Sequence, residues 1–308
     1  MVRSAYASDV NTETSAERVV NTRRVLSYFV YPVIVLGGGA AIVWALGAGL
    51  PSAVAVGAVT IAGAVGVTAL ERLLPYEPSW NRSAGDAAAD ATHYVVNLAI
   101  KQSALALYGA LVARAGVFAE VWPRSWPLAA QALVALVVVD VCLYSVHRLS
   151  HANHFLWRLH AVHHASRRLY WVNGEKRHPL HQILEGLPGV TALMLVGAPQ
   201  AALVAALGIL GLNMMLQHGN VAYRAGWLRY VFSVAELHRW HHRRSADESR
   251  VNFGAFFAVW DVVLGTYFND PHTAPVREVG VDELPAVPDD YTGQLAWPFR
   301  SKETERPG

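Results

Sequence analysis

Residues 26–46 read LSYFVYPVIVLGGGAAIVWAL and residues 54–70 read VAVGAVTIAGAVGVTAL, and neither run contains a charged residue. A helix needs about 20 mostly apolar residues to cross the hydrocarbon core of a bilayer. The short link between the runs, GAGLPS, is typical of a tight turn. The two runs therefore predict a transmembrane hairpin. The alternative is a pair of core helices buried inside a soluble protein.

The composition favours a membrane protein. Hydrophobic residues make up 53% of the 308 residues and charged residues 16%, whereas a soluble domain carries about 25% charge. The mean hydropathy is +0.25. The single cysteine, Cys142, excludes a disulfide scaffold and a thiolate cluster, and the net charge of +2 argues against a nucleic-acid partner.

Three further segments have the length of a helix in a membrane. Residues 128–146 predict another crossing, and residues 187–216, which are interrupted by Pro199, predict a helical hairpin or a re-entrant pair. Residues 90–112 predict a third membrane helix that carries a polar stripe on one face. The stripe consists of Asp86, Asp90, His93, Asn97 and Lys101. We expect it to face the bundle interior, where it packs against protein or lines a path to a site; the alternative is an amphipathic helix on the membrane surface.

Basic residues near the predicted spans set the expected orientation. They precede the first span, follow the span that ends near Val146, and recur between residues 239 and 244. Both termini and the segments after the spans are therefore expected on the cytoplasmic side. We expect a cytoplasmic segment at residues 1–25, the hairpin at 26–70, a catalytic domain at 71–268 and a polar tail at 269–308.

Histidine is the unusual residue of this chain, with fourteen copies, twelve of which lie between His147 and His242. They form three boxes, which are HRLSH at 147–151, HAVHH at 160–164 and HRWHH at 238–242. On a helix, residues three and four apart project from the same face, so each box directs two or three imidazoles toward one point. Imidazole suits iron, zinc, copper and nickel. The eight histidines are too many for one tetrahedral ion, and they predict two metals.

The histidines and a nearby carboxylate also have alternative roles. Histidines can be hydrogen-bonded core residues, a surface feature or a pH sensor. Asp140 lies on the same helical stripe as His147 and His151. It is expected either to orient a ligating imidazole or to form a salt bridge with Lys101, and the sequence does not choose between these roles.

The order HxxxH, HxxHH, HxxHH on a chain with several spans resembles the fatty acid hydroxylase/sterol desaturase superfamily of membrane di-iron proteins. Further matching segments are YWVN at 170–173, RHPL at 177–180, QHGN at 217–220, NFG at 252–254, WD at 260–261 and LGTY at 264–267. The resemblance runs from about Glu71 to Phe299. It implies an all-helical fold with a stalk of four membrane helices and a cytosolic cap that holds two irons.

The resemblance also implies a ligand set. The matching positions are His147, His151, His160, His163, His164, His178, His218, His238, His241 and His242. Family members often have a glutamate where this chain has His181, so His181 is expected to be a ligand, a partner of a ligand, or neither. His154 has no counterpart in the family, and we expect His178 to matter more than His181.

The expected activity is hydroxylation of an unactivated C–H bond of a lipid-like substrate (fatty acyl, sphingolipid or sterol type), with O2 as co-substrate. A desaturase or an ether-cleaving monooxygenase would share these residues. A metal transporter or sensor is a candidate from another class, but a transporter places its ligands near the bilayer midplane, whereas these histidines follow the ends of the spans.

The reaction needs external electrons, and the chain shows no dinucleotide fingerprint and no cysteine cluster for iron–sulfur binding. We therefore expect a separate donor, such as a ferredoxin or a cytochrome with its reductase. It is expected to dock on basic residues of the cap, and these are Arg167, Arg168, Lys176, Arg243 and Arg244. The alternative is that these residues anchor the cap to anionic lipid headgroups.

Overall fold

The computed structural model describes residues 15–115, 121–270, 272–273, 276–282 and 287–300. Parts of the predicted N-terminal segment and C-terminal tail, residues 1–14 and 301–308 among them, lie outside the described residues. Over the described ranges the chain is helical and contains three isolated β-bridges but no strand. The predicted all-α class is confirmed.

The long helices are α1 (Ser15–Tyr31), α2 (Gly38–Gly47), α3 (Ser52–Leu73), α4 (Ala87–Ala115), α5 (Leu128–Ala152), α7 (Pro179–Leu195) and α8 (Gln200–His218). The short helices are α6 (His154–His164), α9 (Ala235–His241), α10 (Val259–Leu264) and α11 (Tyr291–Ala296). A π-turn, η1 (Pro32–Gly37), joins α1 to α2. Single 3₁₀ turns are η2 (Pro78–Asn81), η3 (Trp171–Glu175), η4 (Gly226–Tyr230) and η5 (Trp297–Phe299).

Four helical segments are long and apolar enough to cross a membrane, and these are Arg23–Gly47, Ser52–Leu73, Leu128–Ala152 and Gln200–His218. The predicted hairpin of residues 26–70 and the crossing at residues 128–146 are among them. The expected third span at residues 90–112 is not among the candidates found in the described part of the chain. The second half of the predicted 187–216 segment takes its place. That segment forms a hairpin, as expected, with α7 and α8 joined by a turn at residues 196–199.

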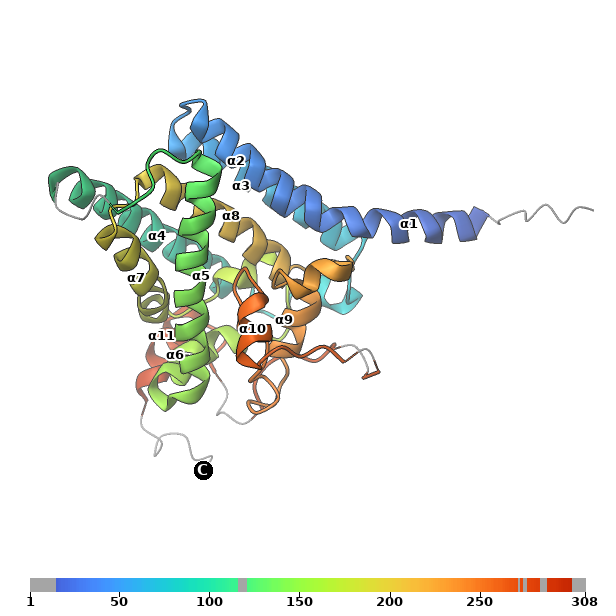
Figure 1. The fold of residues 1–308 in the computed structure, drawn as a ribbon. Coiled ribbons are helices and arrows are strands. Elements are labelled where there is room, and N and C mark those ends of the chain that lie inside the picture. The colour runs from blue at the N-terminus through green and yellow to red at the C-terminus, as the bar shows by residue number, and fades with distance from the viewer. Residues whose placement is uncertain (1–14, 116–120, 271, 274–275, 283–286, 301–308) are drawn as a thin grey trace, which may run out of the picture.

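Helix α8 is the central helix of the bundle, and α2, α3 and α5 pack around it (Figure 1). Close approach depends on small residues. A Cβ atom at Gly38 of α2 would lie 2.7 Å from Leu212 Cδ1, and one at Gly63 of α3 would lie 2.9 Å from Leu212 Cδ2. Leu212 therefore occupies the space that two glycines leave, which is the small-residue packing that membrane helices use.

The polar stripe of α4 faces protein, as the sequence predicts. Asp90 Oδ1 lies 2.9 Å from Lys176 Nζ, and Asp86 Oδ2 lies 2.8 Å from Arg168 Nε. Asn97 Nδ2 donates to the carbonyls of residues 175 and 177. These contacts attach α4 to the chain segment that follows the second histidine box, at the lower end of the bundle in Figure 1, where α6, α9, α10 and α11 gather.

Candidate metal centre

The three histidine boxes meet at one place, near the C-terminal ends of α5, α6 and α9. The first box occupies the last two turns of α5, the second the end of α6, and the third α9 and the residue that follows it. The histidine side chains of all three boxes are buried. Helix periodicity places them on the inner face of each helix, and the packing of the helices brings the three faces together.

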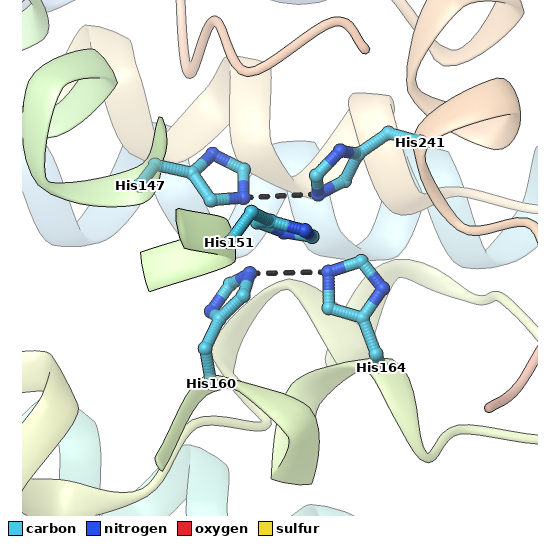
Figure 2. A group of neighbouring side chains, drawn as sticks. All are labelled: His147, His151, His160, His164 and His241. Atoms are coloured by element: carbon cyan, nitrogen blue, oxygen red, sulfur yellow. Dashed lines mark hydrogen bonds between the residues drawn. The ribbon is translucent and has the colours of Figure 1, made fainter. Parts of the chain in front are cut away.

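The boxes form two groups of imidazoles. The first group consists of His147, His151, His160, His164 and His241, and the second of His163, His218, His238 and His242. Within each group, the ring nitrogen atoms offered by its members all lie within 4.8 Å of one another. Figure 2 shows the first group, in which rings from α5, α6 and α9 point toward a common centre.

The two HxxHH boxes exchange members between the groups. His160 and His164 belong to the first group and the intervening His163 to the second, whereas His238 and His242 belong to the second and His241 to the first. Because His164 and His242 have ring centroids 4.7 Å apart, the two groups are direct neighbours.

In the first group, ring nitrogens face each other with no proton between them. His147 Nδ1 lies 2.8 Å from the Phe253 carbonyl oxygen and His241 Nδ1 lies 2.9 Å from that of Val251. A carbonyl only accepts, so both Nδ1 atoms must carry the proton of the neutral ring. The Nε2 atoms of the two rings are 2.9 Å apart, and in neutral rings both present lone pairs. Such a pair of lone pairs suits a cation that lies beside both nitrogens and binds to both.

The second group repeats this arrangement. His163 Nδ1 donates to the Lys176 carbonyl at 3.1 Å, and His218 Nδ1 donates to the Met214 carbonyl at 2.9 Å. Their Nε2 atoms face each other at 3.2 Å. A carbonyl that fixes Nδ1–H and turns Nε2 inward is the usual support of a metal-binding histidine. Both groups therefore fit a metal ion.

Burial keeps the imidazoles in the form that binds metal. It lowers the pKa of His160, His163 and His241 well below the ordinary value, and repulsion from neighbouring histidines lowers it further. The same causes, in the same order, lower the pKa of His164, His238 and His242. The rings are thus neutral at physiological pH, and each retains a lone pair for a metal ion.

His178 belongs to the predicted ligand set, but it lies in neither group. Its Nδ1 accepts from the Leu180 N–H at the start of α7, and its Nε2 donates to the Leu295 carbonyl at 3.2 Å. Both nitrogens therefore have structural partners. His218, the other position taken from the family, lies in the second group.

His181 lies next to the first group without joining it. Its ring is 4.7 Å from the ring of His160, and its Nε2 contacts Ser150 Oγ at 3.0 Å. Its Nδ1 lies 3.9 Å from Glu185 Oε2. His154 is exposed at the start of α6. Of the roles open to His181, this position fits a partner that packs on a ligating ring.

Asp140 forms neither of the direct contacts expected from the sequence. Its carboxylate contacts no histidine and not Lys101, which pairs with Glu175 at 2.5 Å. It accepts from the backbone N–H groups of Phe256 and Phe257, at 2.7 and 3.0 Å, and from Trp260 Nε1 at 2.8 Å. Asp140 therefore holds the loop after the third box and reaches the histidines only through that loop.

The loop of residues 251–257 is the part of the site that sequence reasoning missed. It supplies the carbonyls of Val251 and Phe253 to the first group, and Asp261 holds it by accepting from the N–H groups of Phe253 and Gly254 at 2.8 and 2.9 Å. Gly254 is required there, since a Cβ atom would lie 2.4 Å from the Phe257 carbonyl oxygen. The NFG and WD segments, which match the family, mark this loop in the sequence. Nothing in them indicates that the loop supports the histidines.

The basic surface expected for an electron donor is smaller than predicted. Lys176 and Arg168 are buried, at 3% and 8% exposure, and paired with Asp90 and Asp86. Their charges are needed inside the fold. Arg167, Arg243 and Arg244 stay nearer the surface, and each lies close to a carboxylate. Of the predicted residues, these three remain candidates for a docking surface.

Comparison with known proteins gives consistent matches. The sequence model of the fatty acid hydroxylase family matches residues 132–266, which include all three boxes and His218. An ornithine lipid hydroxylase of Rhizobium tropici is 32% identical over 244 residues, 77% of this chain and 73% of that protein. A sphinganine C4-monooxygenase of Arabidopsis thaliana is 27% identical over 50% of this chain and 59% of its own length. An alkylglycerol monooxygenase of Caenorhabditis elegans is 23% identical over 50% and 29%. No solved structure matches the chain.

Proposed function

This chain belongs to the fatty acid hydroxylase superfamily, and on that premise we propose that it inserts one oxygen atom from O2 into an unactivated C–H bond of a lipid. The observation that carries the proposal is the pair of neighbouring histidine groups. They contain five and four histidines, and the ring nitrogens of each group gather at one point. We assign one iron ion to each group. The bound irons would supply the activation of O2 that an unactivated C–H bond requires.

The chain's own residues provide the environment for that chemistry. Nine imidazoles hold the two ions, and the carbonyls of Val251, Phe253, Lys176 and Met214 fix the orientation of four of the rings. Burial of the histidines limits the access of water to the reacting centre. The membrane helices next to the site give a lipid access without passage through water. We assign residues 71–268 to the catalytic unit and place its metal centre on the cytoplasmic face.

The experiment that tests the proposal combines metal content with product analysis. Purified protein should contain two irons per chain, and membranes that contain it should form a lipid heavier by one oxygen atom when O2 and electrons are supplied. The variant His241→Ala removes a ligand of the first group, and the variant His163→Ala removes a ligand of the second group. Each variant should lose at least half of the iron and form no product, since a two-metal site fails when either ion is lost.

His154→Ala is the matched control, because His154 is exposed and belongs to neither group. It should retain iron and activity. Full iron content in both ligand variants would contradict the assignment of the groups. A product lighter by two hydrogens would identify a desaturase, and metal-dependent ion flux without O2 consumption would identify a transporter.

A further inference from the structure

A cavity of about 170 Å³ lies between α4, α5, α7 and α8, the four helices grouped on the left of Figure 1. Its wall is mostly apolar, with Leu143 from α5, Val190 from α7, and Leu207 and Leu210 from α8. At one side Ile183 and Leu187 of α7 line it and are 45% and 56% exposed. Exposed apolar side chains at a mouth suit contact with lipid rather than water.

The inner end of the cavity is close to the metal centre. Leu143 lines the cavity one helical turn before His147, and Met214 lines it one turn before His218. Gln182, which also lines it, follows His181 in the chain, and the ring of His181 packs on His160. The cavity wall thus includes residues that lie one helical turn before a ligand of each group.

The cavity also has polar atoms without partners. Glu175 Oε2, Arg177 Nε and Gln182 Oε1 are buried and form no hydrogen bond, although all three residues line the cavity. Gln182 is 7% exposed. The other polar atoms of the two charged residues have partners. Glu175 Oε1 contacts Lys101, and Arg177 NH1 contacts Glu185. Buried polar groups are normally satisfied, so these three atoms indicate a ligand that both donates and accepts hydrogen bonds.

We propose that this cavity binds the segment of the lipid substrate next to a hydroxyl or amide group, and that Arg177, Glu175 and Gln182 hold that group. The proposal rests on the proposed function and adds the region of the substrate that reaches the site. An apolar cavity of about 150 Å³ holds a molecule of the size of benzene, so 170 Å³ accommodates only a short piece of chain. The remaining chain leaves through the mouth between α4 and α7 and lies in the bilayer.

Two glycines determine how much chain fits. Gly186 of α7 and Gly211 of α8 line the cavity, and a Cβ atom at either position meets no atom within 4 Å. A Cβ atom therefore fits at either position without displacing protein, and we expect a leucine there to extend into the cavity. Gly66 of α3 has equally open surroundings but does not line the cavity, which makes Gly66→Leu a matched control.

The test uses photolabelling in nanodiscs and needs no turnover. The probes are hexadecanamide and hexadecane, each with a diazirine on the third carbon. The amide probe should label cavity residues of α5, α7 and α8. Gly186→Leu and Gly211→Leu should each lower this labelling at least tenfold, and Gly66→Leu should leave it unchanged. Gln182→Leu should reduce labelling by the amide several-fold more than labelling by the alkane.

The outcomes separate this proposal from the proposed function. Wild-type labelling outside the cavity, unchanged labelling in both glycine variants, or an equal effect of Gln182→Leu on both probes would each overturn the assignment of the cavity. Labelling as expected in a protein that carries no iron and oxidises no lipid would support the cavity and contradict the function. Normal lipid oxidation with unchanged labelling in both glycine variants would support the function and overturn the cavity.

Discussion

Asp140 is expected to control metal binding although it contacts no histidine. It is fully buried, and its two carboxylate oxygens accept three hydrogen bonds from the loop and from Trp260. In Asp140→Asn, one oxygen becomes an NH2 group and at least one of the three donors loses its acceptor. A buried donor left without a partner costs about 1–3 kcal/mol. At about 2–4 °C per kcal/mol, the midpoint of thermal unfolding should fall by about 2–12 °C.

The same change should weaken iron binding. The loop that Asp140 holds carries the Phe253 carbonyl, which accepts from His147 Nδ1. Loss of such a supporting partner lowers metal affinity about 10–100-fold. Iron retention against a chelator series, measured beside thermal unfolding in detergent, gives both quantities. In Asp140→Ala all three donors are orphaned, and the cost rises to about 3–9 kcal/mol.

Asp247→Asn is the control, since the Asp247 side chain is 88% exposed and pairs only with Arg250 among the contacts described. It should change neither the midpoint nor iron retention. The reasoning is refuted if Asp140→Asn unfolds at the wild-type temperature and retains iron equally well. If it loses stability but not iron, the loop does not support His147, and Asp140 has a purely structural role.

Three further predictions concern neighbouring features. His181→Ala should reduce iron retention more than His178→Ala, the reverse of the expectation from sequence, because His181 packs on His160 while His178 caps α7; greater iron loss in His178→Ala would contradict this. Ser245→Cys in a Cys142→Ala background should be labelled by an impermeant maleimide only after cells are opened, and labelling of intact cells would reverse the topology. Arg244→Glu should slow reduction by an acidic carrier protein several-fold at low salt and little at high salt, and equal rates at low salt would exclude this arginine from the docking surface.

Much of the architecture follows from local sequence patterns. Apolar runs predicted three of the four candidate spans, and the i, i+3, i+4 spacing predicted that each box presents one face of a helix. Periodicity also predicted that the polar stripe of α4 faces protein, but not which residues it meets. It forms buried ion pairs with Arg168 and Lys176, and those partners lie about 80 residues away in the chain, beyond the reach of periodicity.

The details of the site depend on tertiary contacts in the same way. Spacing alone does not say that His163 and His164 face different centres, because that depends on where α8 and α9 pack against α6. Position in a family motif suggested a ligand at His178, but the start of α7 and the Leu295 carbonyl occupy its nitrogens. Asp140 shares a stripe with two ligands, yet the loop packs beside it and takes its hydrogen bonds.

The exchange of histidines between the two groups has a consequence for how the protein matures. Each ion would cross-link α6 to α9, and the chain between His164 and His241 forms a closed loop whenever either ion is present. Closing a loop of that length costs about 4 kcal/mol of chain entropy. The first ion to arrive bears this cost alone, whereas the second meets helices that are already aligned. We therefore expect cooperative loading: at limiting iron, a population of chains would divide into empty and doubly loaded molecules with few half-filled ones between them.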